Sequence, residues 1–290
     1  MIFMIHNINK TNIEAWDLKI EDLVIGFFDG LHQGHTHLFD DIKKTTVLTF
    51  ITIPKKNRTL YPLEERVQQL KRLGIKDIII YDLKDDNCTA YEFVKKYLYK
   101  LNPKRIIVGS DFVFGSDQKD VTILKDLFNC KIVKTDKFSS SLIKNKINYG
   151  KIKAANAALI QPYYRSSQVI QGQQHGRVLG FPTINFILDQ KLVNIYNGVY
   201  ITNTIIDSKP YPSVTFVGRP LTIDENREVL IETYIINFKQ DLYGKKLSVV
   251  FNKFLMEPKK FKDEAELKIN ITKYVNSAKK YHKLTTAHKL

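Results

Sequence analysis

The hydrophobic residues of this chain change their period once, and that change constrains the fold more than any other feature. From residue 23 to about 135, short apolar runs alternate with stretches of helical spacing. After about residue 160, strand-like runs follow one another, with a glycine or proline between most of them. The sequence therefore predicts two domains of unlike class, with a boundary near residues 150–162.

The first part reads as βαβ units that build a parallel sheet. Residues 62–73 begin with a proline suited to a helix start and repeat Leu63, Val67 and Leu70 at helical spacing. Ligands of such sheets bind beyond the carboxyl ends of the strands, and residues 26–35 directly follow the apolar run LVI (23–25) of the first strand. The predicted strands are 23–28, 46–50, 75–83, 105–109 and 130–134.

The second part reads as an antiparallel barrel or sandwich. Near the end of the chain, Leu267, Ile271, Val275 and Ala278 recur at the spacing of an amphipathic helix. We expect this helix to pack on the barrel rather than to bind a partner. The predicted strands are 166–172, 183–188, 198–206, 211–217, 228–238 and 246–255.

The composition argues against several classes of protein. The formal net charge is +15, but only 8 of the 45 basic residues are arginine, the usual side chain for bidentate phosphate and guanine contacts, so nucleic-acid binding is not favoured. No run approaches the ~18 apolar residues of a membrane span, and the N-terminus does not resemble a secretion signal. Cys88 and Cys130 are too few for a disulfide scaffold, and we expect buried thiols in a reducing cytoplasm.

The stretch GFFDGLHQGH, residues 26–35, is the most informative local motif. His32 and His35 fall on one side of a first helical turn, where unpaired N–H groups and the helix dipole favour an anion. Gly30 permits the turn, and Gly34 lets the backbone approach closely. Two other interpretations remain open from these residues alone, namely imidazoles that merely cap the helix and a metal pair that lacks its third ligand.

This motif and others resemble bacterial bifunctional riboflavin kinase/FMN adenylyltransferases, also called FAD synthetases. The resemblance implies an α/β nucleotidyltransferase domain (parallel sheet, Rossmann-like, HxGH type) at residues 1–158. An antiparallel β-barrel riboflavin kinase domain with a C-terminal helix would follow at residues 159–290. The resembling segments occur in family order and are GFFDGLHQGH, YPLEERVQQLKRLGI (61–75), GSDFVFG (109–115), FSSSLIK (138–144), GRVLGFPTIN (176–185), NGVY (197–200) and ETYIINFKQDLYGKKLSVVFNKFL (232–255).

In the first domain, the resemblance implies that His32 and His35 hold the phosphates of ATP while an FMN phosphate oxygen attacks the α-phosphorus. Pyrophosphate leaves and FAD forms. For two groups of residues the sequence also allows a structural role in place of a ligand contact, because Asp111 could shape a turn and Ser139, Ser140 and Ser141 could cap a helix. The implied nucleotide-binding residues are Gly26, Phe28, Asp29, Gly30, Gly34, Ser139, Ser140, Ser141 and Lys144, and the implied flavin-binding residues are Asp111, Phe112 and Phe114.

In the second domain, the resemblance implies that Thr183 and Asn185 bind Mg²⁺ and the ATP phosphates, since magnesium prefers oxygen ligands. Glu232 corresponds to the base that deprotonates the ribityl 5′-hydroxyl of riboflavin. Without the resemblance, Glu232 would read as a solvated strand carboxylate. The residues implied to form a loop over the ATP phosphates are Gly172, Gly176, Gly180 and Pro182.

The chain also departs from the family pattern. Residues 51–53 precede Pro54 where the family has a more polar segment, and Ser141 and Lys144 replace its threonine and arginine. In the kinase domain, FVGRPL (216–221) is one residue short, with Phe216 in place of an asparagine, and Tyr234 and Asn237 replace residues that are often His and Asp.

These departures leave an alternative open, a riboflavin kinase with a degenerate nucleotide-binding first module. A transferase for another small phosphate and a basic nucleic-acid-binding protein are further rivals. The expected partners are flavins and ATP, without nucleic acid or membrane. The oligomeric state stays open, a weak homo-oligomer included.

Overall fold

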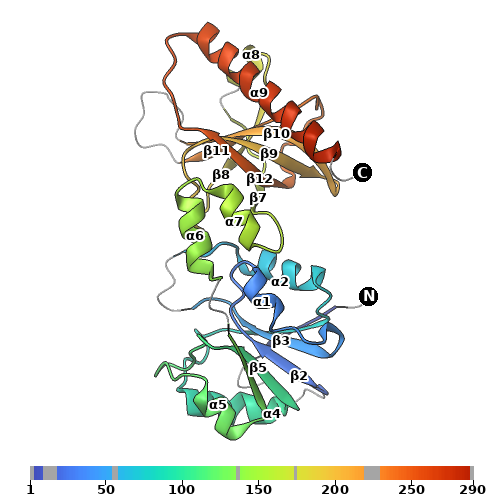
Figure 1. Ribbon diagram of the computed structural model, residues 1–290, viewed down its shortest axis with the longest axis vertical. Helices are drawn as coiled ribbons and strands as arrows, with labels where there is room; N and C mark the ends of the chain where they lie inside the picture. Colours follow the sequence, from blue (N-terminus) through green and yellow to red (C-terminus); the bar gives the residue numbers. More distant parts are fainter. Residues whose placement is uncertain are drawn as a thin grey trace. The chain divides into compact units, whose positions relative to one another are not determined.

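The computed structural model describes residues 3–8, 18–53, 58–134, 138–172, 175–218 and 229–287. The chain packs as two compact units, Met1–Leu142 and Ile143–Leu290 (Figure 1). This division lies N-terminal to the domain boundary expected at residue 158. The difference arises because the last helix before that boundary packs on a strand of the second unit.

A parallel sheet forms the first unit, with strand order β1-β4-β3-β2-β5-β6. The chain runs outward from β2 through β3 to β4 and then returns to the other side of β2 with β5 and β6. This order places a topological switch point between β2 and β5. The strands are β1 (Met4–Ile8), β2 (Asp22–Ile25), β3 (Thr45–Phe50), β4 (Asp77–Tyr81), β5 (Arg105–Gly109) and β6 (Cys130–Val133).

Helices cover both faces of this sheet, with α1 and α2 on one side and α4 and α5 on the other (Figure 1). The central strands β2 and β3 are buried at every position, as is typical of a parallel sheet that is covered on both faces. The helical segments are α1 (Gln33–Thr36), η2 (Ile42–Lys44), α2 (Leu63–Arg72), α3 (Ala90–Phe93), a π-helical turn η3 (Val94–Leu98), α4 (Tyr99–Leu101) and α5 (Thr122–Leu127).

The second unit is an antiparallel sheet of order β7-β12-β9-β10-β11-β8. A single bridge between Ile170, just after β7, and Asn185 on β8 nearly closes it into a barrel. The strands are β7 (Tyr164–Gln168), β8 (Thr183–Ile187), β9 (Gly198–Ile206), β10 (Lys209–Gly218), β11 (Leu230–Ile235) and β12 (Lys246–Met256), and the helices are α7 (Ile152–Ala158), α8 (His175–Val178) and α9 (Glu264–Ala287). Helix α6 (Ser140–Asn148) begins in the first unit and continues into the second.

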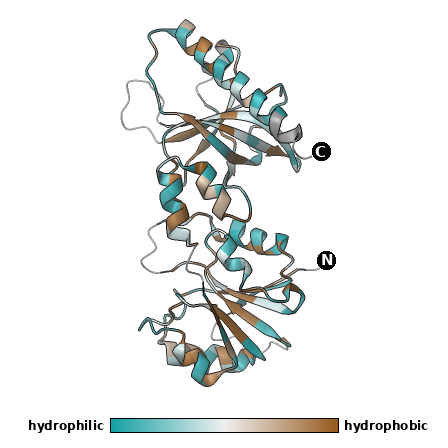
Figure 2. Ribbon diagram, in the orientation of Figure 1, coloured by the Kyte–Doolittle hydropathy of each residue, from teal (hydrophilic) through white to brown (hydrophobic). Residues whose placement is uncertain are grey.

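Helix α9 packs on β9 and β10, as its periodicity predicted. Val275 and Ala278 are buried in one cluster with Val199 and Ile201 of β9 and Val214 of β10. Hydrophilic residues run along much of α9, whereas hydrophobic residues concentrate on the strands (Figure 2). The helix therefore completes the core of its own unit.

A row of buried hydroxyl groups crosses β9, β10 and β11. The Thr215 hydroxyl lies 2.8 Å from that of Thr202 and 2.9 Å from that of Thr233. Ser213 lies 3.0 Å from Thr202 and accepts from Thr204, also at 3.0 Å. Each of these side chains is completely buried, so the hydroxyls satisfy one another.

Two expectations need correction. Strand β1 was not predicted, because an edge strand of which only Ile8 is buried carries no continuous apolar run. Cys88 is buried as expected, but Cys130 is only half-buried.

Among the described residues, none of the helices is both long and apolar enough to cross a membrane.

Candidate active sites

The first unit contains a cavity of about 680 Å³ at the switch point of its sheet. Its walls come from the segments that follow the carboxyl ends of four strands, β2, β3, β4 and β5, together with residues 138–141. Loops at this edge of a doubly wound sheet carry the ligand site, so the cavity lies where the sequence predicted one. We call residues 26–35, which follow β2, the histidine loop.

His32 and His35 belong to the polar part of the cavity wall. His32 is the residue before α1, and the two imidazoles stack with ring centroids 3.7 Å apart and planes 19° apart. The backbone N–H of His32 donates to Nδ1 of His35 at 3.3 Å. Both rings therefore occupy one side of the first helical turn, as their spacing predicted.

Burial controls the charge of His32. The residue is 3% exposed, and desolvation lowers the pKa of His32 from 6.5 to about 4, against the opposing effect of the Asp111 carboxylate. At neutral pH this imidazole is uncharged. A neutral imidazole can still donate one N–H to an anionic oxygen, and a bound phosphate would favour its protonation.

The backbone of the histidine loop is shaped around Phe28. This residue has φ 53°, a left-handed conformation that is rare for an aromatic side chain, and Gly30 turns the chain with φ 78°. A Cβ at Gly26 would lie 2.8 Å from the Phe28 ring, so only glycine leaves room for it. The ring packs edge-on against His35 at 5.3 Å, and the turn thus braces the second histidine.

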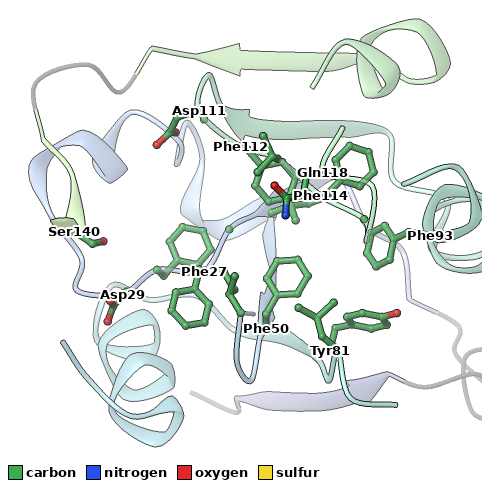
Figure 3. A pocket seen from close by; sticks show the side chains of 18 of the residues that line it. Phe27, Asp29, Phe50, Tyr81, Phe93, Asp111, Phe112, Phe114, Gln118 and Ser140 are labelled. Atoms are coloured by element: carbon green, nitrogen blue, oxygen red, sulfur yellow. The ribbon is translucent and has the colours of Figure 1, made fainter. Parts of the chain in front are cut away.

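Aromatic side chains form the opposite part of the cavity. Phe93 packs against Tyr81 with ring centroids 5.2 Å apart and against Phe114 at 6.1 Å, and Phe112 stacks on Phe114 at 5.7 Å. Figure 3 shows Asp29, Asp111 and Ser140 on one side of the cavity and these rings on the other, with Phe50 among them. Such a cavity can hold a flat aromatic ring at one end, and at the other end the imidazoles of His32 and His35 can donate to an anionic group.

Most of the residues that were predicted for this site line one cavity. Ile53, from the segment that departs from the family, lines it as well and is half-buried. Among the described residues, Gly30, Gly34 and Lys144 are predicted site residues outside the lining. Those within it are Gly26, Phe28, Asp29, His32, His35, Asp111, Phe112, Phe114, Ser139, Ser140 and Ser141.

Two of these predicted residues have structural partners. Asp29 is buried, and its Oδ1 accepts from the backbone N–H groups of Leu60 at 2.7 Å and Tyr61 at 3.3 Å. The Ser139 hydroxyl accepts from the Leu142 N–H at 3.2 Å, so the serine cluster does open a helix, as its alternative interpretation held. Capping and ligand contact are compatible for Ser140 and Ser141, which also line the cavity.

Sequence reasoning missed much of the aromatic wall. Phe50 and Tyr81 are the last residues of β3 and β4, and their position at the carboxyl end of predicted strands was a usable signal. Phe93 lies on α3 and Cys88 lies just before that helix, and only tertiary packing brings these two to the cavity.

In the second unit, the strand register brings together Thr183, Asn185 and Glu232. Glu232 of β11 lies directly opposite Asn185 of β8, and Thr183 is two residues from Asn185 on the same strand. Directly paired residues, and residues two apart, point to the same face of a sheet. The three predicted side chains therefore share one face, and Glu232 is half-buried there rather than fully solvated.

Gly172 and Gly176 approach this face closely. A Cβ at Gly172 would lie 2.1 Å from Nδ2 of Asn185, whose side chain is 4% exposed, and a Cβ at Gly176 would lie 3.5 Å from Oγ1 of Thr183. A 2.7 Å hydrogen bond from the Phe181 N–H to the Gly176 carbonyl closes a turn over residues 176–181. Gly180, with φ 85°, lies within that turn, and Pro182 directly precedes β8.

The oxygen atoms of Thr183 and Asn185 are ligands of the type that Mg²⁺ accepts. No cluster of three or more His, Cys, Asp or Glu suited to a metal ion occurs in the described part of the chain. Of the FVGRPL segment, residues 219–221 lie outside the described residues, and so does Pro54 of the first unit.

Comparison with known proteins assigns the two halves of the chain separately. A family model described as FAD synthetase matches residues 17–147, and one described as riboflavin kinase matches residues 159–282. The order of the two matches is that of the two units.

Relatives match along most of the chain. A bifunctional riboflavin kinase/FMN adenylyltransferase of Mycoplasma pneumoniae is 34% identical over 92% of this chain and 99% of its own length. A trifunctional protein RibF/MnmA of Mycoplasmoides gallisepticum is 43% identical over 92% of this chain, which spans only 41% of that longer protein. A crystal structure from Streptococcus pneumoniae, titled as a macrolide-efflux protein, matches with a TM-score of 0.84 at 28% identity, covering 95% of this chain and 98% of that one.

Proposed function

The chain belongs to the family of bifunctional riboflavin kinase/FMN adenylyltransferases and combines both activities, and from this premise we propose how its residues divide the two reactions. The second unit phosphorylates riboflavin to FMN with ATP. The first unit transfers the adenylyl group of a second ATP to FMN, giving FAD and pyrophosphate. A kinase with a degenerate first module is not favoured, because the FAD synthetase model matches residues 17–147.

The observation that supports adenylyl transfer in the first unit best is the pair of stacked histidines at the polar end of an aromatic cavity. The flavin ring would lie among Phe112, Phe114 and the neighbouring aromatic residues, with its phosphate directed toward His32 and His35. The FMN phosphate is already anionic, so its attack on the α-phosphorus needs no strong base. Donation from the two imidazoles to the ATP phosphates would stabilise the charge that develops during transfer.

The common sheet face of Thr183, Asn185 and Glu232 supports phosphoryl transfer in the second unit. The riboflavin 5′-hydroxyl must lose its proton as it attacks, and Glu232 is the carboxylate available opposite Asn185. Thr183 and Asn185 would bind Mg²⁺ together with the ATP phosphates, because each side chain offers an oxygen atom as a ligand. The metal would neutralise the negative charge of the ATP phosphates. Gly172 and Gly176 carry no side chain that would overlap Asn185 or crowd Thr183 on this face.

The first experiment supplies riboflavin, ATP and Mg²⁺ to the purified protein and separates the flavins over time. We expect FMN to appear first and FAD after it. Glu232→Gln should stop FMN formation but leave the conversion of supplied FMN to FAD, and His32→Asn combined with His35→Asn should do the reverse. Equal loss of both activities in both variants would refute the assignment of two separate sites.

We further propose residues 1–158 and 159–290 as the two functional domains and the cytoplasm as their location. The matches that end at residue 147 and begin at residue 159 support this boundary. Cys88 and Cys130 are free thiols, which suits a reducing compartment.

A further inference from the structure

We propose that the inner face of helix α2 clamps the histidine loop, and that Arg66 and Gln69 on this face are positioning residues for FMN adenylylation. The proposal rests on the function proposed for the first unit. In the described part of the chain, neither Arg66 nor Gln69 belongs to the cavity lining. Any effect of these side chains on the reaction must therefore pass through the segments that they hold, above all the loop that carries His32 and His35.

Arg66 ties together the chain segments that follow β2 and β3. Its guanidinium donates to the carbonyl of Phe27 at 2.7 Å and to the carbonyls of Phe50 and Ile51, both at 2.9 Å. It also lies 4.1 Å from the centroid of the Phe27 ring. Phe27 and Phe50 line the cavity, so one side chain fixes the backbone of two of its walls.

The chemistry of the guanidinium suits this role. Arg66 is 1% exposed, and burial lowers its pKa to about 10, so the group remains charged at neutral pH. Its planar fork directs several N–H donors at fixed angles, whereas a lysine would offer a single ammonium on a flexible stem. A buried charge satisfied by backbone carbonyls holds those carbonyls in defined places, because losing them would leave the charge unsolvated.

Two further contacts join the histidine loop to α2 and the residues just before it. Asp29 accepts from the Leu60 N–H at 2.7 Å, and Oε1 of Gln69 accepts from the Leu31 N–H at 3.4 Å. With the Arg66 bond to Phe27, the loop is held at three alternate residues, and the last of them directly precedes His32. The last contact of the clamp is therefore made by the residue next to His32, the first of the two catalytic histidines.

The sequence of α2 supplies a matched control. Gln68 is exposed on the outer side of the helix, one residue from the buried Gln69. Gln69→Leu removes the acceptor for the Leu31 N–H, and Gln68→Leu makes the same substitution where no clamp contact is involved. Arg66→Met removes the charge and the donors at similar length, and Arg66→Lys retains the charge and an ammonium donor but not the planar fork.

The test measures kcat and KM for FMN-to-FAD conversion in the four variants, and the riboflavin kinase rate of the same chain as an internal control. We expect Arg66→Met to lower kcat for FAD formation about 100-fold, the effect of misplacing a catalytic group by about 1 Å. Gln69→Leu should lower this kcat less, Arg66→Lys should recover only part of it, and Gln68→Leu should retain it. The kinase rate should stay at the wild-type value in all four.

The imidazole NMR signals of His32 and His35 provide a readout that does not depend on activity. They should shift in Arg66→Met and Gln69→Leu and stay unchanged in Gln68→Leu. Wild-type kcat in a folded Arg66→Met variant, or losses that merely follow the unfolded fraction seen by circular dichroism, would overturn the clamp. A wild-type chain that makes no FAD would refute the proposed function instead, and unshifted imidazole signals would then refute the clamp separately.

Discussion

Acidification should destabilise the first unit through His32. Because burial lowers the pKa of this imidazole from 6.5 to about 4, the unfolded chain binds a proton between these pH values and the native chain does not. Stability is therefore highest above pH 6.5 and falls as the pH is lowered. Below about pH 4 the native state binds the proton too, and this contribution to the loss levels off.

The size of the effect follows from the proton affinity of the two states. A pH of 5 lies about 1.5 units below the pKa of the imidazole in the unfolded chain, whereas the imidazole of the native chain is still neutral at this pH. Each pH unit corresponds to 1.36 kcal/mol. The loss from His32 between pH 7 and pH 5 is therefore about 2 kcal/mol. This is a large fraction of the stability of an ordinary domain.

The assay is urea unfolding at pH 7 and pH 5, with hydrogen exchange of the β2 and β3 amides reporting on the first unit alone. His32→Asn should reduce the loss on acidification by about 2 kcal/mol relative to the wild type. His37→Asn, which alters an exposed histidine five residues away, is the matched control and should leave the loss unchanged. Asp111→Asn should leave the loss at pH 5 nearly unchanged, because the native imidazole is already neutral there, and should let the loss continue below about pH 4, because the Asp111 carboxylate raises the pKa of His32.

The reasoning would be refuted by an equal pH dependence in the wild type and His32→Asn, or by an NMR titration of the His32 imidazole near its unperturbed pKa. Bound ATP should oppose the loss on acidification, since an anion beside the ring favours its protonated form.

Three further predictions concern other parts of the chain. Gly172→Ala should abolish FMN formation in a flavin separation assay while leaving FMN-to-FAD conversion, because its Cβ would overlap the Asn185 amide. Thr215→Val should cost about 1–3 kcal/mol in urea unfolding of the barrel, since it leaves two completely buried hydroxyls short of a partner. Burial raises the pKa of the Cys88 thiol, so its alkylation, followed by mass spectrometry, should be slow and should become slower when FMN is bound. FMN should not protect Cys130, because among the described residues Cys130 lies outside the cavity lining.

The sequence alone was sufficient where function depends on neighbours along the chain. The i, i+3 spacing of His32 and His35 places both imidazoles on one side of a helical turn once a helix begins at residue 33. Thr183 and Asn185 are similarly determined to share a face once residues 183–187 form a strand. The change of hydrophobic period likewise indicated a parallel sheet followed by an antiparallel one.

The tertiary structure decided what depends on segments far apart in the sequence. Whether Glu232 faces the same side as Asn185 depends on the β8–β11 register, and a shift of one residue would have turned its carboxylate to the other face.

Arg66 shows the same limit more sharply. A charged residue on an amphipathic helix is expected at the surface, yet this guanidinium is buried because the turns after β2 and β3 offer it three carbonyls. Local spacing fixes which side chains share a turn or a strand face, since that geometry is set by the covalent backbone. The partners of a buried charge, and the walls of a cavity, are set only when the strands meet.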